Sequence, residues 1–307
     1  MDPARRPSAV TVRAPAKVNL HLSVGPLRDD GYHHLTTVFH AVGLYDEVTV
    51  TLASALSCEV TGEGAADVPT DGTNLAVRAV QVLAGRTGAD PRVAVTLRKG
   101  IPVAGGCAGG SADAAAALVA CDVLWGLGLS RDELAALGAG LGSDVPFSLH
   151  GGTALGTGRG EQLTPVLGNG SYAWVLALAE GGLSTPDVYG QLDRQRARGP
   201  VSVAGDPGAV LSALRQGSPE ALGRALSNDL QSPAIALKPG LRKLLGTGEE
   251  LGALGGIVSG SGPTVAFLAR DAAAATDLAA ALTSHDVCRS VRVASGPVPG
   301  ARVTRTD

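Results

Sequence analysis

Residues 102–120 join a glycine-rich loop directly to a run of alanines, a combination that can bind an anion. Glycine permits backbone conformations and close approaches that a side chain would block, whereas alanine is the strongest helix former. The segment therefore predicts a loop that opens a helix at Ser111, with unpaired backbone N–H groups in front of it. Such helix starts bind phosphate groups. The alternative is a tight strand-to-helix connection that binds nothing.

A second group of polar residues lies on one face of a predicted strand over residues 10–24. The even positions of this range are apolar, whereas Lys17, Asn19 and His21 occupy odd positions and so share the opposite face. Pro15 has no N–H for the ladder, so we expect two short strands rather than one. The polar face is either an ordinary solvent-exposed face or one wall of a site.

The spacing of the glycines excludes the common nucleotide-binding loops. No lysine follows the glycines as in the Gly-x4-Gly-Lys-Ser/Thr loop, and the Gly-x-Gly-x-x-Gly pattern of dinucleotide sites is absent. Protein-kinase signatures of the His-Arg-Asp type are missing as well. If the loop binds phosphate, it belongs to another lineage.

Composition indicates a soluble globular protein that is large enough for two domains. The chain has 307 residues, 45% of them hydrophobic and 17% charged, with a net charge of −3. This length exceeds the usual size of one core, and the charge gives no basic footprint for nucleic acid. We find no signal peptide or membrane helix, and four cysteines without metal or redox spacing. We therefore expect a cytoplasmic protein that binds neither nucleic acid nor membrane.

The periodicity mixes helices with antiparallel-looking strands, which predicts an α+β fold. The second half, from about residue 171, reads strand, helices, two strands, helix and strand, the order of a ferredoxin-like sandwich. Strands are predicted at 46–52, 92–97, 172–179, on both sides of 259–264 and at 287–293, and helices at 74–83, 111–125, 132–139, after 181–186, and at 219–226, 240–251 and 271–283.

Three segments in register resemble the motifs of the GHMP kinases, a family of small-molecule kinases. Residues 102–113 resemble the central glycine loop, residues 14–22 the N-terminal motif, and residues 258–265 the C-terminal glycine motif. The resemblance implies two domains, at 1–168 with the ATP loop and catalytic residues and at 169–307 on the substrate side. The first would have a fold shared with a ribosomal protein and the second would be a ferredoxin-like α/β sandwich.

The same resemblance implies ATP with Mg²⁺ as cofactor and no tightly bound protein metal site. Asp144 would act as general base, with Lys17 beside it to keep the carboxylate ionised and stabilise the attacking oxygen. Ser111 would offer a hydroxyl to phosphate or Mg²⁺. The predicted ATP-binding residues are Pro102, Val103, Ala104, Gly105, Gly106, Cys107, Ala108, Gly109, Gly110, Ser111 and Ala112.

The loop departs from the family pattern at a few positions. Ala104 and Ala108 stand where glycine is frequent, and Ala112-Asp113 where Ser-Asn or Ser-Ser is frequent. Alanine still offers its backbone N–H, so the loop should survive. A carboxylate near phosphate is unfavourable, so we expect Asp113 to be a helix-start residue that faces away from the nucleotide. The alternative is that Asp113 helps to hold Mg²⁺.

Within the family, residues 30–35 and 142–147 resemble the member whose substrate is a cytidine diphosphate-linked methylerythritol, phosphorylated on its 2-hydroxyl. The two aromatics Tyr32 and Tyr189 would sandwich the cytosine, and His33 would meet its edge. The full set of predicted substrate-binding residues is Asn19, Tyr32, His33, Thr185, Tyr189, Gly260 and Ser261.

The sequence leaves two alternatives open. The chain could be another GHMP kinase, of the homoserine or mevalonate type, or a non-catalytic regulator or RNA-binding protein. Lys17 together with Asp144, and the lack of a basic composition, argue against the second. If the chain is an enzyme, we expect it to be a monomer or a weak homodimer.

Overall fold

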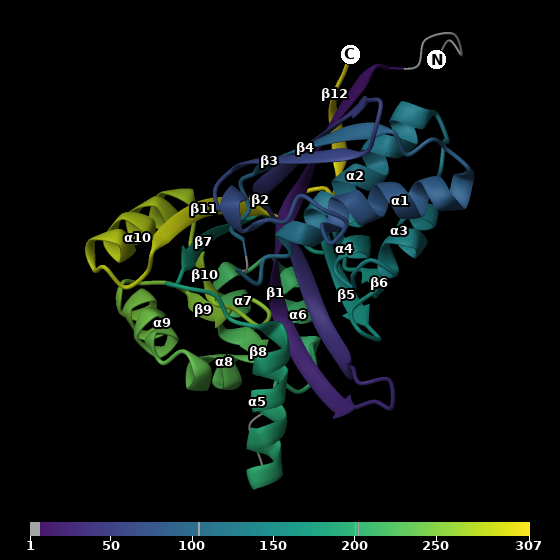
Figure 1. Cartoon of the computed structure of the whole chain (residues 1–307). Coiled ribbons are helices and arrows are strands. Elements are labelled where there is room, and N and C mark those ends of the chain that lie inside the picture. Colours follow the sequence, from purple (N-terminus) through teal and green to yellow (C-terminus); the bar gives the residue numbers. More distant parts are fainter. Residues whose placement is uncertain (1–6, 104, 200, 202) are drawn as a thin grey trace.

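The computed structural model describes residues 7–103, 105–199, 201 and 203–307, and it contains two β-sheets with helices packed against them (Figure 1). The first sheet has the strand order β12-β1-β2-β4-β3, with β5 on β2, β6 on β5 and β8 on β1. Its elements, with the helices between them, are β1 (Ala9–Leu27), β2 (His33–Leu52), β3 (Ser57–Gly62), a 3-10 turn (Ala65–Asp67), α1 (Leu75–Thr87), β4 (Val93–Lys99), α2 (Gly109–Trp125), α3 (Arg131–Ala139), α4 (Val145–His150), β5 (Thr153–Thr157), β6 (Gln162–Pro165), β8 (Ser227–Asn228) and β12 (Arg302–Thr306).

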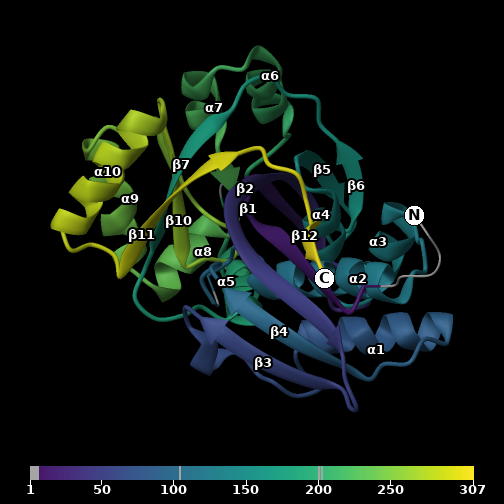
Figure 2. The ribbon, with the colours of Figure 1, turned by 90° about the horizontal axis from the view of Figure 1, so that it is seen from above.

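The second sheet has the order β11-β7-β10-β9, with every neighbouring pair antiparallel. Numbered along the chain this is 4-1-3-2, so the predicted ferredoxin-like arrangement and the α+β class are both confirmed. Helices α9 and α10 lie on the side of this sheet away from the first one (Figure 2). Its elements are β7 (Tyr172–Leu178), α5 (Thr185–Arg198), α6 (Gly208–Gln216), α7 (Pro219–Ala225), α8 (Gln231–Leu237), α9 (Gly240–Glu250), β9 (Gly255–Val258), β10 (Thr264–Ala269), α10 (Ala272–Ser284) and β11 (Ser290–Gly296).

Strand β1 continues through Pro15, so the prediction of two short strands was wrong. The register on β2 jumps from Pro15↔Tyr45 to Ala16↔Val42, which is a β-bulge on the partner strand. A bulge absorbs the missing N–H of proline without ending the ladder. Lys17 and Asn19 therefore lie on one continuous strand, and both are buried in the interior of the molecule.

The alanine-rich helix α2 packs against the first sheet and is buried without a break from Ala112 to Cys121. A helix that is apolar on all sides is a core helix, and small side chains let it lie close to its neighbours. The same apolar core reaches the second sheet through Trp174 and Leu176. The glycine loop therefore leads directly into a helix that is held in place by the core.

The end of the chain returns to the first sheet, because β12 pairs antiparallel with β1. The short strand β8 also pairs with β1, parallel, at His21 and Leu22. Both strands come from the second half of the sequence. The boundary between residues 168 and 169 stays a prediction.

Candidate active site

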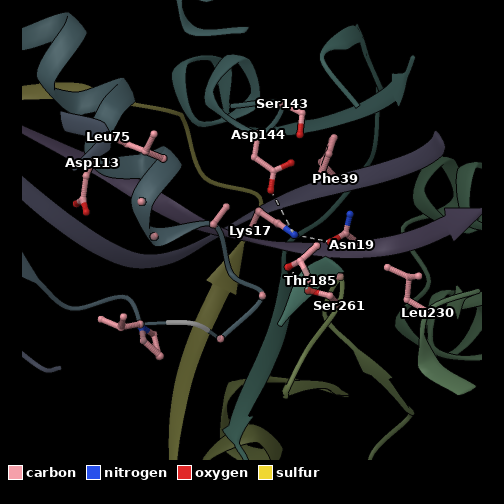
Figure 3. A pocket seen from close by; sticks show the side chains of 18 of the residues that line it. Lys17, Asn19, Phe39, Leu75, Asp113, Ser143, Asp144, Thr185, Leu230 and Ser261 are labelled. Atoms are coloured by element: carbon pink, nitrogen blue, oxygen red, sulfur yellow. Dashed lines mark hydrogen bonds and ion pairs between the residues drawn. The ribbon is translucent and has the colours of Figure 1, made fainter. Parts of the chain in front are cut away.

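A cavity of about 470 Å³ lies where the two halves of the chain meet. Its walls come from β1 and β2, the start of α1, the glycine loop, the turn before α4, helix α5 and the β9–β10 connection. This volume lies within the range of small-molecule sites. Figure 3 shows Lys17 on β1 pointing toward Asp144 and Asn19 at the centre of this space.

Lys17 and Asp144 come together although 126 residues separate them in the sequence. Lys17 Nζ lies 3.7 Å from Asp144 Oδ2. The lysine is only 5% exposed, whereas the Asp144 side chain is 27% exposed and therefore accessible from the cavity. Asp144 is the residue immediately before α4. A buried ammonium beside a carboxylate that a ligand can reach is an arrangement suited to proton transfer and charge stabilisation.

Hydrogen bonds fix the orientation of Lys17. Its Nζ donates to Asn19 Oδ1 at 2.6 Å, Asn19 Nδ2 donates to Thr37 Oγ1 at 2.8 Å, and Thr37 Oγ1 donates to the carbonyl of His21 at 2.7 Å. All these side chains are buried. The face expected to be either solvent-exposed or part of a site is therefore an interior wall, because the second half of the chain covers it.

The glycine loop is tied to both halves of the molecule. The carbonyl of Cys107 accepts from Lys17 N at 3.2 Å, and the carbonyl of Gly105 accepts from Thr264 N at 3.3 Å. The φ of Gly106 is +74°, and a Cβ there would lie 2.2 Å from the carbonyl oxygen of Ser259. Only glycine fits this approach. Ala104 lies outside the described residues.

Helix α2 begins at Gly109, two residues before the predicted start, and Ala108 precedes it with φ +61°. This left-handed conformation is one that glycine adopts freely and alanine only with strain. Cavity-lining residues include Gly109 and Gly110, whose backbone N–H groups open the helix. This is a geometry that can receive phosphate oxygens. Of the eleven predicted loop residues, Pro102, Val103, Gly105, Gly106, Ala108, Gly109 and Gly110 line the cavity.

Asp113 does not start the helix, contrary to our expectation, because it lies on the second turn of α2. Its carboxylate pairs with Lys99 Nζ, which also lies 2.5 Å from Asp46 Oδ2. Asp46 in turn accepts from the backbone N–H groups of Gly100 and Ile101 at 2.7 and 2.8 Å. The start of the glycine loop is thereby anchored to β2 and α2.

The three buried charges in this cluster perturb one another. Burial raises the pKa of Asp113, the nearby Asp46 charge raises it further, and Lys99 opposes both. Burial would lower the pKa of Lys99, but Asp113 and Asp46 outweigh that effect and raise it. The sequence contained no sign of this cluster, since Asp46 starts the predicted strand 46–52 and Lys99 follows the predicted strand 92–97, where exposure is the usual outcome.

On the substrate side, the structure assembles some predicted residues and separates others. Thr185 Oγ1 and Ser261 Oγ are 2.9 Å apart, and both line the cavity together with Tyr189 and Gly260. Burial, and secondarily the charge of Asp144, raise the pKa of Tyr189.

His33 and Tyr32 lie outside the residues that line the cavity. The His33 ring is 5.3 Å from the Tyr189 ring, tilted by 30°, and its Nε2 is 3.0 Å from Asp193 Oδ1 on α5. Tyr32 stands at the β1–β2 hairpin and is 55% exposed. Of the two tyrosines, only Tyr189 lines the cavity, and the predicted sandwich stays a prediction.

Asn228 is a positioning residue that sequence reasoning missed. Its Nδ2 donates to the carbonyls of Val258 and Gly260, both at 2.8 Å, and its Oδ1 accepts from Leu230 N at 2.8 Å. These bonds hold the β9–β10 connection against β1. Asparagine in a polar loop segment is too common for the sequence to have singled it out.

Among the described residues, no three His, Cys, Asp or Glu side chains are grouped closely enough to hold a metal ion. The helices of the described ranges include none with the length and apolar character needed to cross a membrane. The Ser111 hydroxyl faces the segment before Asp144, because a Cβ on Gly142 would lie 3.7 Å from Ser111 Oγ.

Comparison with known proteins agrees with the fold. The sequence-family model of the GHMP kinases N terminal domain matches residues 74–152, and the family model of the GHMP kinases C terminal domain matches residues 210–287. A homoserine kinase from Cytophaga hutchinsonii has a TM-score of 0.75, with 99% of each chain covered. At 20% identity this likeness shows the fold alone.

Two further relatives are closer in sequence. The 4-diphosphocytidyl-2-C-methyl-D-erythritol kinase of Nocardia farcinica is 61% identical, over 97% of each chain. A crystal structure of 4-(cytidine 5'-diphospho)-2C-methyl-D-erythritol kinase is 34% identical with a TM-score of 0.74, covering 93% of this chain and 98% of that one. This identity over nearly the whole length means that the chain belongs to the 4-diphosphocytidyl-2-C-methyl-D-erythritol kinase family of the GHMP kinases.

Proposed function

We propose that this chain transfers the γ-phosphoryl group of ATP to the 2-hydroxyl of 4-diphosphocytidyl-2-C-methyl-D-erythritol, giving the 2-phosphate and ADP in the non-mevalonate isoprenoid pathway. The observation that carries the proposal is the 61% identity to such a kinase over 97% of both chains. The paired Lys17 and Asp144 at the centre of the cavity supply the chemistry that this reaction needs.

Phosphoryl transfer requires positioned reactants, neutralised phosphate charge and an acceptor for the hydroxyl proton. Asp144 would take the proton of the 2-hydroxyl as its oxygen attacks the γ-phosphorus and ADP leaves. Lys17, 3.7 Å from Asp144, would stabilise the developing charge on the attacking oxygen. Because Asn19 already holds Lys17 at 2.6 Å, the ammonium is positioned before any substrate binds.

The phosphates of ATP would lie on the backbone N–H groups at the start of α2, in front of Gly109 and Gly110. Mg²⁺ bound with ATP would neutralise phosphate charge, as it does in other phosphoryl-transfer enzymes. The Ser111 hydroxyl, close to Gly142, is an oxygen donor of the kind that Mg²⁺ accepts. Because the protein would supply only this one oxygen, Mg²⁺ would be held mainly by the phosphates of ATP.

The cytidine end of the substrate would bind near Tyr189 and His33, whose rings are 5.3 Å apart. Thr185, Ser261 and Gly260 would provide polar contacts on the same wall, and Asn19 would lie near the reacting hydroxyl. Tyr32 would complete the base site from the β1–β2 hairpin. One nitrogen of His33 already contacts Asp193, which leaves the other free for the edge of a pyrimidine.

Localisation and assembly are also part of the proposal. All four cysteines are free, and each is buried or half-buried, which suits a reducing compartment such as the cytoplasm. We expect a monomer or weak homodimer. Cell fractionation and sedimentation velocity would test these two statements.

An ADP-release assay on candidate alcohols tests the substrate. We expect ADP release with 4-diphosphocytidyl-2-C-methyl-D-erythritol and at least about a hundredfold less with homoserine or mevalonate, whose kinases share only 20% and 15% identity with this chain. Equal or greater turnover of homoserine or mevalonate would contradict the proposal. Absence of transfer to any alcohol, combined with tight RNA binding, would favour a non-catalytic protein instead.

A further inference from the structure

Arg159 stands in the tight turn between β5 and β6, on the wall of the cavity. The glycines on both sides have positive φ, +74° at Gly158 and +104° at Gly160. The carbonyl of Gly158 accepts from Leu35 N on β2 at 2.8 Å, and Gly160 N donates to the carbonyl of Thr157 at 3.0 Å. These bonds fix the turn to the first sheet, so the arginine extends from a rigid base.

Arg159 differs from the other two cations that line the cavity in how far its charge is already compensated. Lys17 and Lys99 are buried and paired with carboxylates. Arg159 is 37% exposed, and its Nε lies 4.0 Å from Glu161 Oε2. That carboxylate oxygen already accepts the backbone N–H of Arg159 at 2.7 Å. The guanidinium therefore keeps most of its N–H donors available to a ligand.

The guanidinium also packs over an aromatic ring, that of Tyr32 in the β1–β2 hairpin. Its Cζ is 5.2 Å from the centroid of the Tyr32 ring. Stacking uses the face of the guanidinium and leaves the N–H groups at its edge free. The planar fork can then bind two oxygens of a phosphate in parallel, which an ammonium cannot do.

We propose that Arg159 binds the diphosphate of the cytidine diphosphate-linked substrate and so distinguishes it from alcohols that lack this group. The inference rests on the proposed function, which supplies a substrate with a diphosphate between its base and its reacting alcohol. Lys17 pairs with Asp144 at the reacting centre, and Lys99 pairs with Asp46 and Asp113, which hold the start of the glycine loop. Among the residues that the structure describes, Arg159, beside the hairpin that carries Tyr32, is the remaining cavity-lining cation that can bind this diphosphate.

Binding of cytidine and of CDP, measured by isothermal titration calorimetry, tests the assignment. In the unmodified chain CDP should bind more tightly than cytidine. Because a hydrogen bond between charged groups contributes about 1.5–3 kcal/mol, Arg159→Ala should weaken CDP binding about 10- to 100-fold. Cytidine binding should change less than about twofold. Arg159→Lys should recover part of the CDP affinity, since it restores the charge without the fork.

Arg98→Ala is the matched control, because Arg98 is also an exposed arginine beside a glutamate, Glu47, and does not line the cavity. It should leave both affinities unchanged. In the kinase assay Arg159→Ala should raise the KM for the cytidine substrate while leaving kcat and the KM for ATP nearly unchanged.

Two results would overturn the assignment. Equal loss of cytidine and CDP binding in Arg159→Ala would mean that the arginine acts on the base side through Tyr32. Unchanged CDP binding would mean that it has no role in recognition. If the unmodified chain phosphorylates the cytidine substrate in either case, only this inference fails. If it neither phosphorylates the substrate nor binds CDP, the proposed function fails as well.

Discussion

Substitution of Gly260 by alanine would place a methyl group inside the reacting centre. A Cβ there would lie 3.2 Å from Lys17 Nζ and 3.3 Å from Asn19 Oδ1. Both atoms are at the ends of side chains and can retreat by a few tenths of an ångström, so the contact itself costs little stability. The retreat would, however, move the ammonium and the amide that orients it, on which the proposed chemistry depends.

The expected losses differ for stability and for turnover. The φ of Gly260 is +57°, a conformation that costs an L-residue about 1–2 kcal/mol, so the free energy of unfolding should fall by about that amount. Misplacement by 1 Å can cost about a hundredfold in rate. A shift of a few tenths of an ångström should therefore lower kcat about three- to tenfold.

Gly205→Ala is the matched control for backbone strain. Its φ is +67°, and a Cβ there would meet no atom of the described residues within 4 Å. Urea unfolding should show a similar loss of stability in both variants, while the ADP-release assay should show a lower kcat only in Gly260→Ala. If the two variants had the same kcat, the reasoning that Gly260 keeps space for Lys17 would be wrong.

Three further predictions concern charged and titratable groups. Asp144→Asn should lower kcat by about 10²- to 10⁴-fold, the usual contribution of a general base, with ATP affinity by calorimetry nearly unchanged; wild-type turnover would remove Asp144 as the base. Burial lowers the pKa of His40 from 6.5 to about 4, so the unfolded chain binds this proton more readily and stability should fall by about 3 kcal/mol as pH drops from about 6.5 to about 4. Urea unfolding across this range should show the fall in the unmodified chain and a flatter profile in His40→Gln, and identical profiles would contradict the argument. Burial raises the pKa of Asp113, so folding favours the protonated carboxyl, and the stability that this proton contributes is lost as pH rises. Asp113→Asn, which leaves Lys99 paired with Asp46 alone, should therefore keep or raise the melting temperature at pH 8. A marked decrease in the melting temperature at pH 8 would show that both carboxylates are needed.

Local patterns were sufficient for much of the fold. The alanines after the glycine loop predict α2, and the strand and helix order after residue 171 predicts the ferredoxin-like sheet, because helix propensity and alternation act within a few residues. The prediction at Pro15 was wrong because the missing N–H is accommodated by a β-bulge on the partner strand, at residues 42–45. A single sequence does not reveal which neighbouring strand absorbs a bulge.

For the candidate site, the sequence by itself determined which residues are available for chemistry: the glycine loop, Lys17 on a polar strand face, and Asp144 in a short turn. Motif spacing identifies such residues because each motif is local. Only the tertiary structure decided that Lys17 is buried 3.7 Å from Asp144, that Lys99 binds both Asp46 and Asp113, and that Arg159 stacks on Tyr32. These pairings join segments 14 to 127 residues apart, and they form because strand pairing within the first sheet and the packing of α2 and α4 against it bring those segments together, which no local preference encodes.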